Sequence, residues 1–316
     1  MLTREQKMSM GDLRQRQSLA LPIKINMSIS RIRQWYDHWD GNVCVSFSGG
    51  KDSTVLLHLV RSIYPEVPAV FVDTGLEYPE IREFVKTIPN VIIVRPSMNF
   101  KQVIETYGYP VVSKNVAHII DYAKKGKEWA DLLLQGLNKD GSYSRWLATH
   151  YKQWAFLKDA PFKISAYCCD VMKKRPLKKW QKENDCYPYI GTMACESAQR
   201  TQSWLKTGCN AYEGKNKLSK PLSFWMEEDV LTYIRENSLP IAKIYGEIIE
   251  DENGHLKTTG ANRTGCMFCM FGAHLEKSPN RFERMKETHP KQYDFCMRSE
   301  KGLDMDRVLS FLGIRH

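Results

Sequence analysis

The chain has 316 residues, of which 42% are hydrophobic and 26% are charged, which is the composition of an ordinary globular protein with a substantial core. Its formal net charge of +10 favours polyanionic partners such as nucleotides or nucleic acid. No run of about 18 apolar residues is present, which excludes a membrane-spanning helix. The polar, charged start is unlike an export signal, so we expect a cytoplasmic protein without membrane contact. In that compartment we expect the nine cysteines to be metal ligands or reactive thiols rather than disulfides.

Helix and strand patterns alternate through the first two hundred residues. Short runs rich in β-branched and aromatic residues predict strands, and apolar residues at helical spacing predict amphipathic helices. The predicted strands are 42–47, 68–75 and 90–96, and the predicted helices are 27–39, 52–63, 77–88 and 99–108. Strand–helix repetition with short connections predicts an α/β fold with a doubly wound, mostly parallel sheet. The functional loops are then expected at the carboxyl ends of the strands.

The rest of the chain is mostly helical in pattern. Residues from 114 to about 162 show no strand signal and are predicted to form a helical insertion. The further expected elements are a strand at 186–193, helices at 196–205 and 226–237, a hairpin or mobile loop at 247–262, and two or three short helices near the C-terminus. The expected domains are an N-terminal helical arm (1–40), a nucleotide-binding domain (41–245) that contains the insertion, and a helical, cysteine-bearing C-terminal region (246–316).

The sequence SFSGGKDS at 46–53 joins the strand predicted at 42–47 to the helix that follows it. Two glycines let the backbone approach an anion, and the helix N-terminus presents unpaired N–H groups to that anion. The candidate phosphate ligands are Ser46, Ser48, Gly49, Gly50, Lys51 and Ser53. Asp52 is the candidate for holding Mg²⁺ beside the phosphates. A tight turn with one capping serine explains only part of this run, and the spacing does not match the Walker motif.

SGGKDS resembles the PP-loop of ATP pyrophosphatases, and two later segments resemble the phosphoadenosine phosphosulfate (PAPS) reductase family within that superfamily. In VDTGLEYPEIREF (72–84), the resemblance implies that Asp73 and Thr74 contact the adenine. In IGTMACESAQR (190–200), Met193 stands where the family has an arginine. The residues of this segment that match the family are Gly191, Glu196, Ser197 and Arg200. The resemblance covers about residues 31–245 and implies an adenine nucleotide α-hydrolase-like fold.

Four of the cysteines form two close pairs. The candidate metal ligands are the adjacent Cys168 and Cys169 and the C-x-x-C pair Cys266 and Cys269. Four thiolates suit either tetrahedral zinc or a [4Fe–4S] cluster, and spacing alone does not separate the two. CCDVMKKRPL (168–177) resembles the cysteine segment of cluster-bearing sulfonucleotide reductases, which favours iron–sulfur. The basic residues Lys173, Lys174 and Arg175 are expected to lower the thiol pKa values, unless they only form a solvated helix face.

The motifs leave several functions open. Reduction of PAPS or adenosine phosphosulfate (APS) needs a nucleophilic thiolate, which those reductases carry in a C-terminal tail. The last residues of this chain, VLSFLGIRH, contain no cysteine, and Cys296 lies upstream of them. A cluster-bearing ATP pyrophosphatase without that thiol resembles the DNA-phosphorothioation proteins DndC and SspD, which implies DNA as the acceptor and a cysteine desulfurase as the sulfur source. The alternatives are a PAPS/APS reductase, a tRNA-thiolating enzyme, and a non-enzymatic zinc module that binds nucleic acid.

As a pyrophosphatase, the chain is expected to bind ATP with Mg²⁺ and to release AMP and pyrophosphate after attack at the α-phosphorus. Lys51 and Arg200 then stabilise the developing charge, while Asp52 and Mg²⁺ orient the phosphates. DNA binding is expected to be weak, salt-sensitive and without sequence preference. The expected contact stretches are Lys124–Lys127, Lys173–Lys179 and Lys215–Lys220. The sequence leaves open whether the cluster donates sulfur, senses redox state or is structural, whether Cys195 accepts sulfur, and whether the chain forms a homodimer.

Overall fold

The chain forms two compact units in the computed structural model, which describes residues 8–214 and 216–316. Residues 1–7, where the polar start begins, and Lys215 of the third lysine-rich stretch lie outside the described residues. The first unit comprises the chain up to Asp73, Glu77–Arg95 and Leu177–Thr264. The second comprises Thr74–Leu76, Pro96–Pro176 and Gly265–His316, and so includes the helical insertion. No helix in the described ranges is long and apolar enough to cross a membrane.

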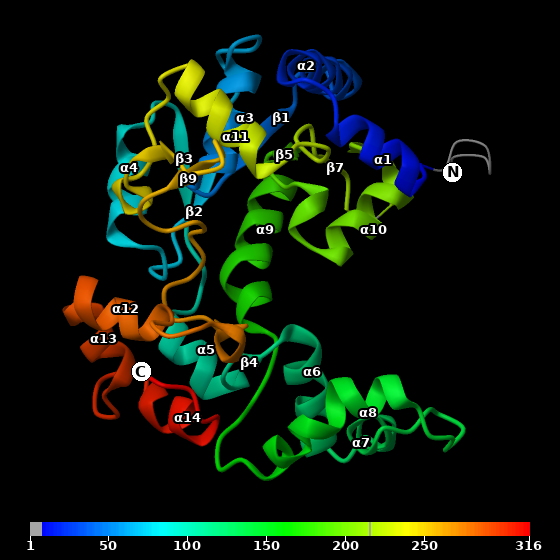
Figure 1. Ribbon diagram of the computed structural model, residues 1–316, viewed down its shortest axis with the longest axis vertical. Coiled ribbons are helices and arrows are strands. Elements are labelled where there is room, and N and C mark those ends of the chain that lie inside the picture. Colours follow the sequence, from blue (N-terminus) through cyan, green and yellow to red (C-terminus); the bar gives the residue numbers. More distant parts are fainter. Residues whose placement is uncertain (1–7, 215) are drawn as a thin grey trace. The chain divides into compact units, whose positions relative to one another are not determined.

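A six-stranded sheet is the centre of the first unit (Figure 1). Its strands, in spatial order, are β3 (Val91–Val94), β2 (Ala69–Val72), β1 (Val43–Phe47), β5 (Tyr187–Ile190), β7 (Leu218–Ser219) and β6 (Asn210–Ala211). The first five are parallel to one another, and β6 pairs antiparallel with β7. The register places Ser46 of β1 opposite Val70 of β2 and Ile190 of β5. The mostly parallel α/β sheet predicted from the sequence is confirmed, and the strand order reverses direction at β1.

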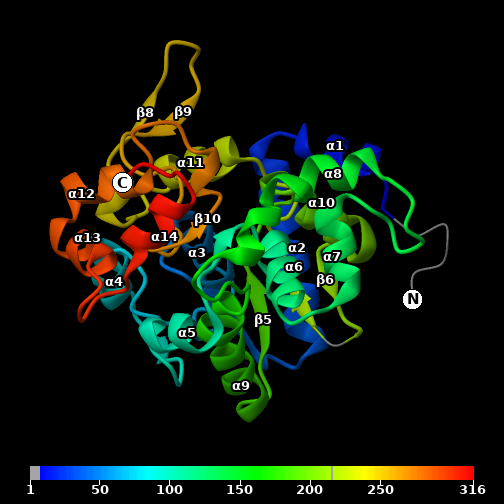
Figure 2. The ribbon, with the colours of Figure 1, turned by 90° about the horizontal axis from the view of Figure 1, so that it is seen from below.

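Helices and one hairpin complete the first unit. The helices that lie wholly within it are α1 (Met10–Gln17), α2 (Leu21–His38), α3 (Lys51–Arg61), α4 (Pro79–Thr87), α10 (Ala198–Thr207) and α11 (Glu227–Glu236). Residues 247–262, expected as a hairpin or mobile loop, form the antiparallel pair β8 (Ile248–Glu250) and β9 (Leu256–Thr258), which stands out beside α11 (Figure 2).

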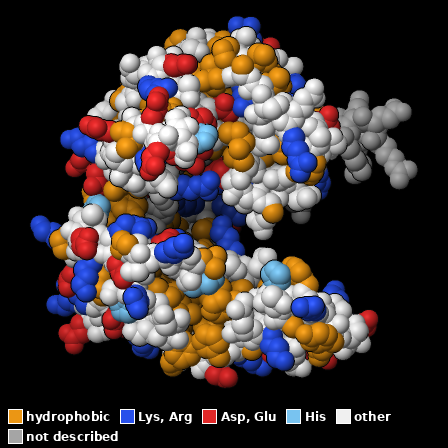
Figure 3. All heavy atoms as spheres, viewed as in Figure 1, with side chains coloured by type: hydrophobic (Ala, Val, Ile, Leu, Met, Phe, Trp, Pro, Cys, Tyr) orange, Lys and Arg blue, Asp and Glu red, His pale blue; other side chains and the backbone are white. Residues whose placement is uncertain are grey.

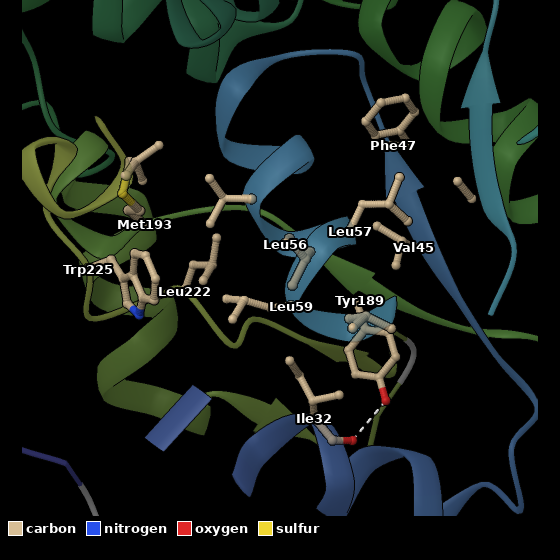
Figure 4. Packing of buried hydrophobic residues seen from close by; sticks show 14 of the residues in the cluster. Ile32, Val45, Phe47, Leu56, Leu57, Leu59, Tyr189, Met193, Leu222 and Trp225 are labelled. Carbon is tan, nitrogen blue, oxygen red and sulfur yellow. Dashed lines mark hydrogen bonds between the residues drawn. The ribbon is translucent and has the colours of Figure 1, made fainter. Parts of the chain in front are cut away.

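Helix α3 is buried along most of its length, which fixes the loop at its start. Leu56 and Leu59 lie in the main hydrophobic cluster of the first unit, together with Trp225 (Figure 4). The hydroxyl of Tyr189 in β5 donates a hydrogen bond of 2.8 Å to the carbonyl oxygen of Ile32 in α2. A helix with apolar side chains on most faces must be covered on most faces, and α3 accordingly contacts β1, β5, α2 and α11. This packing holds the helix start at the carboxyl end of β1.

The second unit is mostly helical. Its helices are α5 (Phe100–Tyr107), α6 (Lys114–Lys124), α7 (Glu128–Gln135), α8 (Arg145–Tyr151), a 3₁₀ segment (Lys152–Asp159), α12 (Arg281–Thr288), α13 (Pro290–Met297) and α14 (Met305–Phe311). The cationic stretch forms a π-helical turn, Asp170–Lys174, which continues into α9 (Arg175–Glu183). A parallel pair of two-residue strands, β4 (Val111–Val112) and β10 (Met270–Phe271), was not predicted.

Candidate phosphate-binding site and cysteine cluster

The loop between β1 and α3 has a backbone that only glycine permits at its centre. Gly49 has a φ of +72°, and a Cβ atom there would lie 2.8 Å from a methyl group of Ile81 and 2.9 Å from one of Val85. Gly50 is the N-cap residue of α3. The backbone of this loop therefore passes close to α4, and the start of α3 lies at its end, which is the arrangement of an anion-binding helix N-terminus.

Hydroxyl groups tie the loop to the first turn of α3. The hydroxyls of Ser48 and Ser53 lie 3.0 Å apart, and the Ser53 hydroxyl donates to the carbonyl oxygen of Gly50 at 2.9 Å. Thr54, which the sequence analysis did not single out, donates to the same carbonyl at 3.1 Å. Ser46 precedes the loop and is half-buried in β1. Ser48 is thus the exposed hydroxyl at the loop, whereas Ser53 is buried and holds its shape.

Lys51 is a buried cation between two carboxylates. Lys51 is only 2% exposed, and its Nζ atom lies 3.3 Å from Asp52 Oδ1 and 3.1 Å from Glu227 Oε1. Burial opposes the charge, but Asp52 and Glu227 outweigh it and raise the pKa of Lys51. Lys51 is therefore protonated at neutral pH, with its charge fixed at the start of α3. Glu227 comes from α11, and the sequence analysis placed only a helix there.

A tyrosine hydroxyl also reaches the start of α3. The Lys51 N–H donates to the Tyr245 hydroxyl oxygen at 3.2 Å, and that hydroxyl lies 2.7 Å from the Thr264 hydroxyl. Burial raises the pKa of Tyr245, so its phenol is neutral at physiological pH. The phenol oxygen therefore accepts a backbone N–H that a bound phosphate oxygen would otherwise accept. Neither Tyr245 nor Thr264 belongs to a motif, and no pattern in the sequence marks them.

The end of β5 lies directly against the start of α3. A Cβ atom on Gly191 would lie 2.9 Å from the carbonyl oxygen of Asp52 and 3.1 Å from the Cα atom of Ser53. Both neighbours are backbone atoms, so a side chain at this position would push β5 and the loop apart. There is therefore a physical reason for the glycine at position 191, which the segment 190–200 shares with the family. It allows close approach of two backbones next to the candidate phosphate site.

The residues after Gly191 form a cluster of ion pairs. Glu196, in the 3₁₀ turn Ala194–Glu196, is paired with Arg200 and lies 3.7 Å from Arg263. Burial lowers the pKa of Arg200 and nearby Arg263 lowers it further, whereas Asp52 raises it, so these groups share one electrostatic environment. Arg263 comes from a different segment, and Met193, where the family has an arginine, donates its N–H to the same Glu196 carboxylate at 2.8 Å. Ser197 caps α10 by accepting the Arg200 N–H at 3.3 Å.

The two predicted adenine contacts have protein partners. The Asp73 carboxylate, at the end of β2, lies 3.2 Å from Nε of Arg82 and 3.4 Å from Nε of Arg95. The Thr74 hydroxyl accepts the Leu76 N–H at 3.1 Å, and Thr74 is buried and belongs to the second unit. Asp73 is thus neutralised by two arginines. The adenine contact of both residues stays a prediction.

The segment at residues 109–112 brings the two cysteine pairs of the second unit together. Tyr109 pairs with Ile164, shortly before Cys168. The β4 strand pairs with β10, which begins directly after Cys269. One short segment of chain therefore holds both cysteine-bearing stretches, although they are far apart in the sequence. Two-residue strands carry too little pattern to be predicted, so this pairing was missed.

The four predicted thiols share one environment. Burial raises the pKa of Cys168, and the nearby thiols of Cys169, Cys266 and Cys269 raise it further. Within the described ranges, no three Cys, His, Asp or Glu side chains converge closely enough to hold a single metal ion. After burial, the groups that act most strongly on the pKa of Cys168 are these three thiols and the cation of Lys173. Four thiols are the donor set of either a tetrahedral zinc site or an iron–sulfur cluster.

Two cations act on these thiols, and one of them was predicted. Burial raises the pKa of Cys269, whereas Arg281 and Lys173 lower it. Arg281 also donates to the carbonyl oxygen of Cys269 at 2.7 Å. Of the other predicted basic residues, Lys174 is exposed and Arg175 pairs with Asp170 at 2.7 Å. Arg281 lies on α12, outside the cysteine motif, so the motif alone did not reveal it.

Two further predicted features have clear positions. Cys195 is exposed, and its thiol donates to the Trp225 carbonyl oxygen at 3.5 Å. Lys220, at the end of the third lysine-rich stretch, is only 7% exposed and its Nζ donates to Ser203 Oγ at 3.0 Å, whereas DNA contact by that stretch stays a prediction. Adjacent lysines suggest a surface segment, but the hydroxyls of Ser203 and Thr207 bind the ammonium group of Lys220 inside the fold.

A model of the phosphoadenosine phosphosulfate reductase domain matches residues 42–145 and 90–270 of this chain. The chain belongs to this family. It is 24% identical over 292 residues to an uncharacterized protein of Methanocaldococcus jannaschii, an alignment that covers 89% of this chain and 54% of that relative. It is 23% identical over 230 residues to the phosphoadenosine 5'-phosphosulfate reductase of Vibrio cholerae, covering 72% of this chain and 70% of that enzyme.

A solved structure of PAPS reductase from Candida auris aligns with 78% of this chain and 98% of that chain, at 15% identity and a TM-score of 0.40. The chain spans about half the length of the curated relatives that it matches first. Its family members include enzymes named as PAPS and APS reductases.

Proposed function

We propose that this member of the PAPS reductase family is an ATP pyrophosphatase that activates a DNA backbone for sulfur incorporation. The observation that carries the proposal is the loop at 48–53, where glycines, exposed and buried hydroxyls and a buried lysine meet at a helix N-terminus. Such a site binds phosphate groups through backbone N–H donors and the helix dipole. The pairing of Lys51 with Asp52 and Glu227 adds the groups that ATP chemistry with a divalent cation requires.

The carboxylates beside Lys51 fit Mg²⁺. Mg²⁺ in nucleotide enzymes is held by one or two carboxylates together with the substrate phosphates, rather than by a closed protein cage. Asp52 and Glu227 are two carboxylates at the loop, and Mg²⁺ bound there would neutralise phosphate charge. Lys51, now held by these carboxylates, would then bind a phosphate oxygen with its Nζ. The N–H of Lys51 would be available once the Tyr245 hydroxyl moves from it.

Arg200 and Arg263 would act on the charge that develops as pyrophosphate leaves. Both guanidinium groups lie at Glu196, and Arg200 is within electrostatic reach of Asp52. Positioned cations that face developing charge in a partly buried site stabilise a transition state more strongly than they do in water. The nucleophile in this proposal is an oxygen of a DNA backbone phosphate, which displaces pyrophosphate and becomes bonded to AMP. Sulfide then attacks that DNA phosphorus, and AMP leaves. Without DNA, water takes the place of this oxygen, and AMP is released slowly.

The four clustered cysteines would hold the iron–sulfur cluster of this proposal. The residues are Cys168, Cys169, Cys266 and Cys269, with Lys173 and Arg281 as the nearby cations. A bound cluster supplies electron transfer or an iron site for a sulfur ligand. The cations would stabilise the thiolate form of the ligands, which is the form that binds metal.

The burial of Cys296, the cysteine nearest the C-terminus, favours this function over sulfonucleotide reduction. A reductase needs a thiolate that reaches the sulfonate sulfur. Cys296 is fully buried, and burial raises the pKa of its thiol well above the ordinary value, so it is neither accessible nor ionised at neutral pH. The net charge of +10 supports a polyanionic acceptor. We propose DNA as that acceptor and a cysteine desulfurase as the source of sulfur.

A reconstituted sulfur-transfer reaction tests this function. The holoprotein is incubated with plasmid DNA, ATP, Mg²⁺, cysteine and a cysteine desulfurase, and phosphorothioate linkages are then measured by mass spectrometry of nuclease digests. We expect ATP-dependent phosphorothioate with the wild-type protein and none with Lys51→Ala.

The reductase alternative is tested in parallel. With thioredoxin and either PAPS or APS, we expect no sulfite above background. Abundant sulfite that disappears with Cys296→Ser, together with no phosphorothioate, would overturn the proposal and identify the protein as a reductase.

A further inference from the structure

The helical insertion carries aromatic side chains that are largely exposed. Tyr143 is 66% exposed and Trp146 is 58% exposed, although large rings are mostly buried in globular proteins. His150 is exposed beside them on α8. Figure 3 shows hydrophobic side chains next to Lys and Arg side chains over the part of the molecule where Figure 1 labels α7 and α8. We call Tyr143, Trp146 and His150 the α8 aromatic surface.

The loop before α8 holds this surface in a defined conformation. The Asn138 N–H donates to the Ser142 carbonyl oxygen at 2.8 Å, and the Asp140 carboxylate accepts both the N–H and the hydroxyl of Ser142. Tyr143 pairs with Leu137 in an isolated β-bridge, and Ser144 caps α8. The exposed ring of Tyr143 thus stands on a closed turn rather than on a free loop. A preformed surface loses little conformational entropy when a ligand binds.

The rings on α8 are also fixed relative to each other. The rings of Trp146 and His150 are stacked, with centroids 4.2 Å apart and an angle of 26° between their planes. His150 Nδ1 lies 2.8 Å from the carbonyl oxygen of Trp146 one helical turn earlier. One face of each ring is used in this stack. The exposed fraction of Trp146 therefore includes ring surface on which another planar group can stack.

Basic side chains surround the aromatic surface. Lys139, Arg145 and Lys152 are all exposed, and none forms an ion pair with a residue in the described ranges. Asp140, the acidic residue of the turn, has its carboxylate engaged by Ser142. Exposed rings flanked by unneutralised cations complement a ligand that has planar groups spaced along a polyanionic backbone.

We propose that the α8 aromatic surface binds a single-stranded stretch of nucleic acid, whose bases stack on Tyr143 and Trp146 and whose phosphates contact Lys139, Arg145 and Lys152. Bases in a duplex are stacked on each other and do not present their faces, so this surface selects unpaired bases. The inference rests on the proposed function, because it specifies the kind of nucleic acid that the enzyme engages. It goes further in predicting that the substrate is locally unpaired.

Fluorescence anisotropy with labelled oligonucleotides tests this inference. A mixed-sequence single strand of about 20 nucleotides and its duplex are titrated with the full-length holoprotein, without ATP. Stacking of one base on one ring contributes about 1–3 kcal/mol, which corresponds to about a fivefold to hundredfold change in affinity. We therefore expect Trp146→Ala to weaken single-strand binding by at least about fivefold and to leave duplex binding within about twofold. Trp146→Phe, which keeps a ring, should retain most of the affinity.

Two control variants separate stacking from other effects. Leu275→Ala removes a side chain that is 78% exposed in the same unit but has no ring, and it should bind the single strand as the wild type does. Replacing Lys139, Arg145 and Lys152 by glutamine should reduce the slope of log affinity against log salt by about 0.7 for each phosphate that is no longer neutralised. Circular dichroism confirms that each variant is folded.

Three results would overturn the inference. The first is that Trp146→Ala binds the single strand as tightly as the wild type does, and the second is that the wild type does not bind it at all. The third is that the wild type is a dimer and Trp146→Ala is a monomer, because the surface would then bind a second copy of the chain. AMP release by the wild-type protein is measured separately. If no AMP is released but single-strand binding depends on Trp146, the ATP pyrophosphatase proposal is refuted and the inference stands. If AMP is released but single-strand binding does not depend on Trp146, only the inference is refuted.

Discussion

Replacing Gly191 by alanine tests whether the close contact between β5 and the phosphate loop matters for nucleotide binding. The new Cβ atom would lie 2.9 Å from the Asp52 carbonyl oxygen and 3.1 Å from both the Asp52 carbonyl carbon and the Ser53 Cα atom. These atoms belong to the backbone of the first turn of α3, so rotation of a side chain cannot relieve the overlap. The buried α3 and the central strand β1 restrict how far the two segments can separate.

Extra atoms in a packed interior cost about 1–3 kcal/mol. For a unit of roughly 150–250 residues, each kcal/mol lowers the melting temperature by about 2–4 °C, so we expect a decrease of about 2–12 °C. The loop amides must also shift by a few tenths of an ångström from the positions that would bind phosphate. We therefore expect the affinity for a non-hydrolysable ATP analogue to fall by at least about tenfold, or about 1.4 kcal/mol.

Isothermal titration calorimetry measures the affinity, and differential scanning calorimetry measures the melting temperature. Gly11→Ala is the matched control, because its Cβ atom would meet only the Ser9 hydroxyl, at an ordinary 3.4 Å, within α1. This control should bind the analogue normally and should melt at the same or a slightly higher temperature. Unchanged analogue affinity in Gly191→Ala, at a lowered melting temperature, would show that this contact stabilises the fold but does not shape the phosphate site.

Four further variants test the site and the cluster. Lys51→Ala and Asp52→Ala should each lower the rate of AMP release by about a hundredfold or more, as is usual when an electrostatic stabiliser is removed; a rate within tenfold of the wild type would contradict their roles. Glu227→Gln should raise the Mg²⁺ concentration needed for half-maximal AMP release, because one of the two carboxylates at Lys51 becomes an uncharged amide, whereas Glu236→Gln at the end of the same helix should not. Protein purified without oxygen should be brown and contain about four iron and four sulfide ions per chain; Cys168→Ser should remove this colour, and stoichiometric zinc without iron would exclude the cluster.

The sheet was predictable because its signals are local. Strands β1, β2 and β3 are short β-rich runs, and α3 and α4 have strong apolar periodicity, so the order of elements follows from pattern alone. Gly49 and Gly191 were predicted because they belong to motifs, and the structure shows the steric reason, since a Cβ atom at either position would overlap with neighbouring atoms. Local pattern gave no sign of β6 and β7 in the same sheet or of β4 and β10, because strands of two residues have no period to detect.

The partners of the motif residues were much less predictable. Glu227 reaches the loop from α11 and Tyr245 from a 3₁₀ turn, and Arg263 reaches Glu196 from a separate segment. Their approach depends on tertiary packing, which no local pattern reports. Lys220 illustrates the opposite error, since its charge predicts exposure whereas the hydroxyls of Ser203 and Thr207 bind its ammonium group inside the fold.

Product analysis with ATP labelled separately at the α- and γ-phosphates tests the central claim most directly. The holoprotein is incubated with each labelled ATP and Mg²⁺, with and without DNA, and the products are separated by thin-layer chromatography. We predict that the α-label appears in AMP and the γ-label in pyrophosphate, and that neither product forms with Lys51→Ala. Release of the γ-label as inorganic phosphate with the α-label in ADP would contradict the account, because the bond broken would then lie between the β- and γ-phosphates.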